Sequence, residues 1–175
     1  MLTITISGPA GSGKSTVAKL IAKNFGLRYY SVGSFFRKKA SEAGLSIGEF
    51  MKTATASLHN EADNFVKSLS KKGNIVIDGR LSGYMAGENA NFKIFINAPV
   101  EVRAKRISKR ENLSEKEILE KTIARDKVDR DSYQKIYGID ICDLNIYDFV
   151  LDNEHLNIEE TKKALETAIK RTLKI

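Results

Sequence analysis

The stretch from Gly8 to Thr16, GPAGSGKST, has the residue types and spacing of a phosphate-binding loop. Its glycines allow backbone amides to point at a triphosphate, and the N-terminus of a following helix adds positive potential. In such a loop Lys14 reaches the β- and γ-phosphates and the Ser15 hydroxyl binds Mg²⁺. The apolar run LTITI precedes the loop, and a helical pattern follows it. The predicted ATP phosphate site consists of Gly8, Pro9, Ala10, Gly11, Ser12, Gly13, Lys14, Ser15 and Thr16.

A carboxylate, Asp78, ends the apolar run NIVID. An aspartate in this position is often only a turn or cap residue. Beside a phosphate loop, it can instead face the water shell of Mg²⁺. We therefore predict Ser15 and Asp78 as the metal residues, with Mg²⁺ as the cofactor and ATP as the phosphoryl donor.

The phosphate loop does not identify the acceptor. The chain has no NKxD-type guanine motif and neither the HRDxxxxN nor the DFG motif, which argues against a GTPase and a protein kinase. No side chain is an obvious base for a hydroxyl acceptor. A phosphate acceptor needs no base, because it is mostly ionised at neutral pH, but it does need cations around it. Arg37 and Arg80, which follow predicted strands, are the best candidates for that role.

Further arginines lie on the two helices predicted after Pro99. A guanidinium binds phosphate through two parallel hydrogen bonds, which a lysine cannot do. For Arg103 and Arg106 the alternative is a solvated helix face. For Arg125 and Arg130 it is an ion pair with a neighbouring aspartate.

Alternating apolar runs and helical patterns predict the elements that position these residues. Strands are expected at residues 2–7, 27–32, 73–79, 91–98 and 147–153. Helices are expected from 14 to a stop at Gly26, at 33–44, at 47–72 with a break around 53–60, from Pro99 towards 110, from a capping box at Ser114 and Glu117, and at 157–173. The closing helix places Ile158, Leu165, Ile169 and Leu173 on its apolar side. This pattern indicates an α/β fold with a five-stranded parallel sheet flanked by helices, whose ligands bind beyond the carboxyl ends of the strands.

The composition fits one domain spanning residues 1–175. The sequence has 42% hydrophobic and 29% charged residues and a net charge of +7. The single cysteine, Cys142, excludes an internal disulfide and offers no zinc cluster. His59 and His155 are expected to be surface or capping residues. No run is long enough to span a membrane, so we expect a cytoplasmic protein.

Nearly the whole chain resembles the nucleoside monophosphate (NMP) kinases, specifically cytidylate kinases of the compact archaeal type. The resemblance is carried by the segments GPAGSGKST, SVGSFFR, GNIVIDGRLSGYMAG, KIFINAPVEVRAKRISKRE, TIARDKVDRDSY and YGIDICDLNIYDFVLDN. The phosphate loop is shared by many families. The combination of IDGRLSGYMA with YGIDICDLNIYD is much more specific.

This resemblance implies the roles of several residues. Arg37 and Arg80 would hold the monophosphate, while Arg125 and Asp129 would match positions near the closing lid, with Asp129 on the cytosine side. The chain departs from the family at Ser132, where relatives tend to have an arginine that helps to bind the nucleotide, a role for which Arg130 is the available substitute. The NMP-binding segment would span about residues 33–72 and the lid about residues 103–132.

The predicted activity is transfer of the ATP γ-phosphoryl group to CMP or dCMP. The catalytic residues would be Lys14, Arg80 and Arg125. The NMP-binding residues would be Arg37, Asp78, Gly79, Arg80 and Asp129, and the lid residues Arg106, Arg110 and Arg130. We expect a monomer with no nucleic-acid or membrane partner. The alternatives are an adenylate kinase or another small-molecule kinase of the same fold, such as the shikimate and gluconate types, and a nucleic-acid-associated ATPase.

Overall fold

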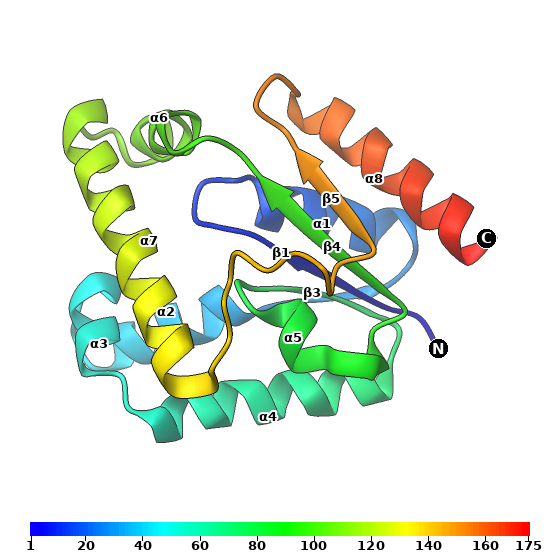
Figure 1. Ribbon diagram of the computed structural model, residues 1–175, viewed down its shortest axis with the longest axis horizontal. Helices are drawn as coiled ribbons and strands as arrows, with labels where there is room; N and C mark the ends of the chain where they lie inside the picture. The colour runs from blue at the N-terminus through cyan, green and yellow to red at the C-terminus, as the bar shows by residue number, and fades with distance from the viewer.

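The computed structural model describes residues 1–175, apart from the side chain of Lys52. Its centre is one sheet of five parallel strands in the order β2–β3–β1–β4–β5 (Figure 1). The strands are β1 (Thr3–Ser7), β2 (Arg28–Ser31), β3 (Ile75–Asp78), β4 (Phe92–Asn97) and β5 (Phe149–Asp152). The predicted α/β class and parallel five-stranded sheet are therefore confirmed.

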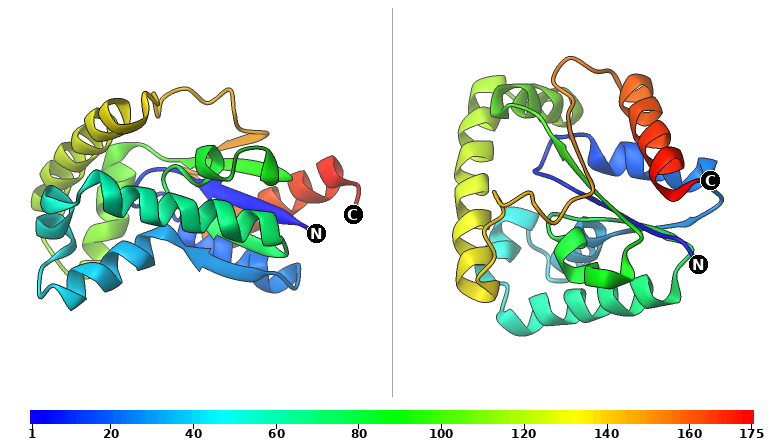
Figure 2. Two further views of the ribbon diagram at one scale, coloured as in Figure 1. Left: turned by 90° about the horizontal axis from the view of Figure 1, so that it is seen from below. Right: turned by 45° about the vertical axis from the view of Figure 1, so that its right-hand side comes forward.

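Helices cover both faces of this sheet, and two of them lie beyond the carboxyl ends of its strands. They are α1 (Lys14–Asn24), α2 (Val32–Glu42), α3 (Ile47–Thr53), α4 (Ala56–Lys72), α5 (Ser82–Ala86), α6 (Val100–Glu111), α7 (Glu115–Tyr137) and α8 (Ile158–Leu173), with a short 3-10 helix η1 (Gly87–Asn89). Figure 1 shows α6 and α7 beyond the carboxyl ends of the strands, and Figure 2 shows α7 running from α6 towards α4.

The strands are apolar on both faces because both faces are covered. Ile4 of β1 packs with Val17 of α1 and Leu165 of α8 in one core cluster. On the other face, Ile77 of β3 packs with Val66 of α4 in a second cluster, which α5 also joins. This three-layer packing fixes the strand ends, and with them the loops that follow the strands.

The predicted elements agree with the structure in place and type, with four local differences. The break between α3 and α4 spans only residues 54–55, because Thr55 caps α4 with a hydrogen bond from the Leu58 amide to its side chain. The short helix α5 and η1 were not predicted. Pro99 is the N-cap of α6 rather than a residue of its first turn. Ser114 does precede α7, but its side chain makes no capping hydrogen bond.

Two predictions about single side chains were wrong. His59 is buried on α4, at 7% exposure, whereas a surface or capping residue was expected. Ile158 lies at the first turn of α8 and is 52% exposed, so the apolar side of that helix consists of Leu165, Ile169 and the partly buried Leu173. Among the described residues, no helix combines the length and the apolar character that crossing a membrane requires.

Candidate active site

The loop between β1 and α1 has a backbone path that only glycine can follow at key positions. Gly8 has a φ of 145°, and a Cβ there would lie 2.1 Å from the carbonyl oxygen of Ile96. Gly11 has a φ of 81°, and a Cβ there would lie 2.7 Å from the carbonyl oxygen of Arg103. The loop is therefore pressed against β4 and α6 and leads directly into the N-terminus of α1, the arrangement that binds phosphate.

A buried polar side chain ties this loop to the far edge of the sheet. Asn153, directly after β5, donates from Nδ2 to the carbonyl oxygen of Ser12 at 2.9 Å. Arg106 of α6 in turn donates to Asn153, to Oδ1 at 2.9 Å and to the carbonyl oxygen at 2.8 Å. Arg106 was predicted as a lid residue, and in this structure its guanidinium is engaged beside the loop.

Lys14 begins α1 and lies in a strongly cationic environment. Its Nζ donates to the carbonyl oxygen of Pro9 at 3.0 Å. Burial and the nearby Arg80 lower the pKa of Lys14 to about 7, although Asp78 opposes the shift. A triphosphate in the loop would stabilise the charged ammonium, so the arrangement favours an anion at this place.

Asp78 interacts electrostatically with Lys14 and ends the buried strand β3, which lies between β2 and β1. Ser31 donates to its Oδ1 at 3.0 Å and the Tyr29 hydroxyl donates to Oδ2. Ser15, in the first turn of α1, is also within hydrogen-bonding range of Tyr29. Asp78 and Ser15 thus offer the hard oxygen donors that suit Mg²⁺, which one or two carboxylates typically hold together with substrate phosphates. The described residues hold no group of three or more His, Cys, Asp or Glu side chains that could bind a metal ion.

A second group of cationic side chains interacts with Lys14 and comes from the turn after β3 and from α7. Arg80 forms an ion pair with Asp129, and both side chains are largely buried. Arg125 keeps contact with solvent, yet the loss of surrounding water and the closeness of Arg80 lower its pKa to about 10. Arg37 of α2 also acts on Arg125 electrostatically. Three guanidinium groups that approach one another in this way are suited to a phosphate.

The remaining predicted site residues differ in their exposure and in their contacts. Arg37 is exposed and donates to Ser34 at 2.9 Å. Gly79 packs so tightly that a Cβ would lie 2.8 Å from a methyl group of Val32. Arg110 is exposed and paired with its neighbour Glu111, and Arg130 is exposed on α7. The structure thus brings Lys14, Asp78, Arg80, Arg125 and Asp129 together, and it leaves Arg110 and Arg130 at the surface.

Arg103, which the sequence left undecided, proves to be a structural residue. It is 5% exposed and donates to the carbonyl oxygens of Ala98 at 2.9 Å and Ala10 at 3.1 Å. Its third contact is an ion pair with Asp126 of α7 at 2.6 Å. One side chain thus joins α6, the phosphate loop and α7. Three residues after Asp126 on α7, Asp129 forms an ion pair with Arg80 in the same way.

Replacing Arg103 with methionine is expected to lower the free energy of unfolding by about 3 kcal/mol, because breaking a buried ion pair leaves its partner uncompensated. Urea denaturation followed by circular dichroism measures the change. Arg110→Met is the matched control on the same helix, since that side chain is 68% exposed, and it should change stability by less than about 0.5 kcal/mol. Equal effects of the two substitutions would contradict the structural role of Arg103.

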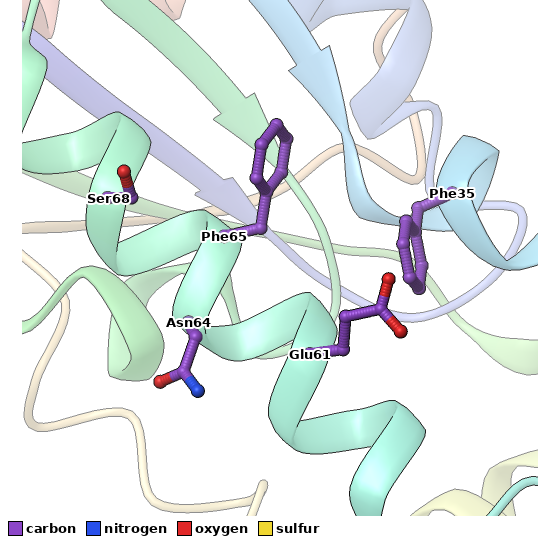
Figure 3. Close-up of a pocket in the computed structure, with 5 residues that line it drawn as sticks. All are labelled: Phe35, Glu61, Asn64, Phe65 and Ser68. Carbon is purple, nitrogen blue, oxygen red and sulfur yellow. The ribbon is translucent and has the colours of Figure 1, made fainter.

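A separate hollow of about 360 Å³ lies between α2 and α4 (Figure 3). It is lined by Phe35, Glu61, Asn64, Phe65 and Ser68. On α4, these residues occupy the face opposite that of His59 and Asp63. No lining residue belongs to the phosphate loop or to the arginine cluster, so this hollow is distinct from the candidate active site.

Comparison with solved structures defines the class of fold. An uncharacterized protein from Eubacterium ventriosum superposes with a TM-score of 0.71 at 23% identity, covering 97% of this chain and 99% of that one. A shikimate kinase from Bacteroides thetaiotaomicron gives 0.64 at 14% identity, covering 99% of each chain. With its phosphate loop and all-parallel sheet, the chain has the fold of the P-loop small-molecule kinases.

Sequence comparison then identifies the family. The model of the cytidylate kinase-like family matches residues 3–155. A cytidylate kinase from Staphylothermus marinus is 39% identical and covers 99% of both chains, and one from Pyrococcus horikoshii is 42% identical over 96% of this chain and 88% of that one. The chain belongs to the cytidylate kinase-like family. The predicted resemblance is therefore confirmed.

Proposed function

We propose that this chain transfers the γ-phosphoryl group of ATP to CMP or dCMP and so forms the diphosphate. The observation that carries the proposal is that Arg80 and Arg125 lie near enough to Lys14 to interact with it electrostatically. The phosphate loop would bind the triphosphate of the donor, and the guanidinium groups near it would bind the phosphate of the acceptor. Membership of the cytidylate kinase-like family supports cytosine as the base of the acceptor.

The chain's own residues would act mainly by positioning and by electrostatics. Lys14 and Arg80 would stabilise the phosphoryl group as charge develops on its oxygens during transfer. Arg125 and Arg37 would neutralise the acceptor phosphate, which otherwise repels the donor. The acceptor would displace Asp129 from Arg80 or bind beside their ion pair. The place of Asp129 on the cytosine side remains a prediction.

We propose Mg²⁺ as the cofactor, with Ser15 and Asp78 holding it directly or through water. The ion would supply charge neutralisation between the phosphates. Tyr29 and Ser31 hold the Asp78 carboxylate by hydrogen bonds, and Asp78 also faces Lys14, so its orientation is set before any ligand binds.

We also propose that two segments of the single domain have separate tasks. Residues 33–72 would bind the monophosphate, and residues 103–132 would act as the lid that excludes water during transfer. In this arrangement Arg103 and Asp126 connect the lid to the phosphate loop. The expectations of a cytoplasmic monomer and of no nucleic-acid partner remain predictions.

A diphosphate-forming assay with ATP and Mg²⁺ tests the proposal. The acceptor panel contains CMP, dCMP, UMP, AMP, GMP and shikimate. We expect the highest kcat/KM with CMP or dCMP. A preference for AMP or for shikimate would overturn the base assignment and leave the fold intact, and ATP turnover stimulated only by RNA or DNA would favour the nucleic-acid-associated ATPase.

A further inference from the structure

Two segments with the sequences IDGRLSGYMA and YGIDICDLNIYD pack against each other. The first contains Arg80 and the short helix α5. The second begins at Tyr137, the last residue of α7, and continues as residues 138–148, the crossing segment, which leads to β5. Figure 1 shows the crossing segment running from α7 past α5 to β5. The proposed transfer assigns no role to α5 or to the crossing segment.

A tyrosine of α5 holds the crossing segment by its hydroxyl. Tyr84 donates to the carbonyl oxygen of Asp143 at 2.9 Å and to that of Asp140 at 3.3 Å. The side chain of Asp140 accepts from the amide of Cys142 at 2.9 Å, and that of Asp143 accepts from the amide of Asn145 at 3.0 Å. Aspartate favours turns closed in this way. One hydroxyl of α5 thus binds both turns of the crossing segment.

A tyrosine of the crossing segment makes the opposite contact, onto α5. The ring of Tyr147 lies so close to Gly83 that a Cβ there would be 2.8 Å from a ring carbon. Its centroid is 6.2 Å from that of Tyr84 and 5.1 Å from that of Phe95 on β4. The amide of Gly83 donates to the Ser7 hydroxyl at the end of β1, at 3.1 Å. The helix α5 is therefore enclosed between the crossing segment and the end of β1.

These contacts bear on Arg80, which lies between β3 and α5. The helix α5 has only five residues, too few to be stable by itself, so its neighbours determine its position. The hydroxyls of Ser82 and Ser7 are hydrogen-bonded at 3.0 Å and tie the start of α5 to β1. Asp129 of α7 pairs with Arg80. The chain of α7 thus reaches the stretch from Arg80 to Tyr84 twice, through Asp129 and through the crossing segment.

We propose that Tyr84 and Tyr147 are positioning residues: by joining α5 to the crossing segment, they hold Arg80 in place relative to Arg125 of α7 for phosphoryl transfer. This inference rests on the proposed function, in which Arg80 stabilises the phosphoryl group. A misplacement of about 1 Å caused far from the reacting atoms can lower a rate about a hundredfold. Two tyrosines that do not belong to the arginine cluster can therefore affect turnover through the position of Arg80.

The first test is Tyr84→Phe, which keeps the ring and removes the hydroxyl. Using the full chain with ATP, Mg²⁺ and CMP, we expect kcat to fall about tenfold, less than the loss that a full misplacement would cause. The KM for ATP should change by less than about twofold, because the phosphate loop binds the triphosphate without contacting Tyr84. Tyr30→Phe is the matched control: it removes a hydroxyl on β2, outside this group of contacts, and should leave kcat unchanged.

The second test repeats Tyr84→Phe in a chain that already carries Arg80→Ala. If Tyr84 acts through Arg80, its loss in that background should lower kcat by less than about twofold, since coupled residues are not additive. A general structural role would lower kcat by the same factor in both backgrounds. Equal factors would overturn the proposal, as would an unchanged kcat in the folded Tyr84→Phe variant.

A second variant and the parent proteins complete the design. If Tyr84→Phe does not fold, Tyr147→Phe takes its place in both backgrounds, and the same two outcomes decide. A wild-type chain that does not phosphorylate CMP would contradict the proposed function itself. An Arg80→Ala variant with unchanged kcat would contradict the role of Arg80 within it. Both failures differ from equal factors in the two backgrounds, which would overturn only the positioning role.

Discussion

Replacing Arg80 with alanine is expected to lower kcat with CMP by about two to three orders of magnitude, the usual effect of removing one preorganised group that stabilises charge in a transition state. ATP affinity without the acceptor should stay nearly unchanged, because the loop and Lys14 hold the triphosphate. Steady-state kinetics and calorimetric titration with ATP measure the two quantities. Equal losses in kcat and in ATP affinity would contradict this role for Arg80.

The Arg80→Ala variant has a second consequence, for which the experiment must control. Asp129 would lose its partner while largely buried, which destabilises the fold. Adding Asp129→Asn to Arg80→Ala should restore much of the stability but not the turnover. Arg171→Ala, an exposed position on α8, serves as a control for the loss of a guanidinium elsewhere.

The elements that carry the site could be predicted because local patterns specify them. The apolar run before Gly8, the loop itself and the helical pattern after it agree with β1, the loop and α1. The strand that ends at Asp78 and the helix that carries Arg37 were likewise in place. In a parallel sheet, this local information is sufficient to bring several strand ends to the same edge.

The sequence could not indicate which aspartate forms an ion pair with which arginine. Arg125 has Asp126 and Asp129 nearby in the sequence, yet these aspartates pair with Arg103 and Arg80. These pairs depend on how α6 and α7 pack and on where β3 ends, which no local pattern specifies.

The burial of His59 has a similar explanation. The residue type of His59, which lies between Leu58 and Asn60, does not indicate whether the side chain is buried or exposed. Here His59 shares a face with Ala62 and Val66, which pack inward, and it lies against rings from α2 and α7. The four-residue spacing on α4 places His59 beside Asp63, whereas the contacts with Phe36 and Tyr137 are tertiary.

Replacing Lys14 with methionine is expected to have the largest effect of all, a fall in kcat/KM of about a thousandfold or more. The apolar side chain keeps the bulk of lysine, but it removes the only ammonium placed at the phosphate loop by the described contacts. Burial and Arg80 depress the pKa of Lys14, so the charged ammonium is destabilised in the folded protein. A bound triphosphate would stabilise that charge. The substitution should therefore leave stability unchanged or raise it while it abolishes transfer.

The comparison of stability with activity makes this prediction specific. Lys23→Met, at the exposed end of the same helix, removes a lysine without touching the loop and should keep both properties close to wild type. Thermal unfolding and the CMP assay give the two readouts for each variant. A Lys14→Met protein that lost stability as well as activity would show that Lys14 supports the loop, through its hydrogen bond to Pro9, rather than the reaction. A stable and inactive variant would place Lys14 in the chemistry, as the depressed pKa and the neighbouring Arg80 lead us to expect.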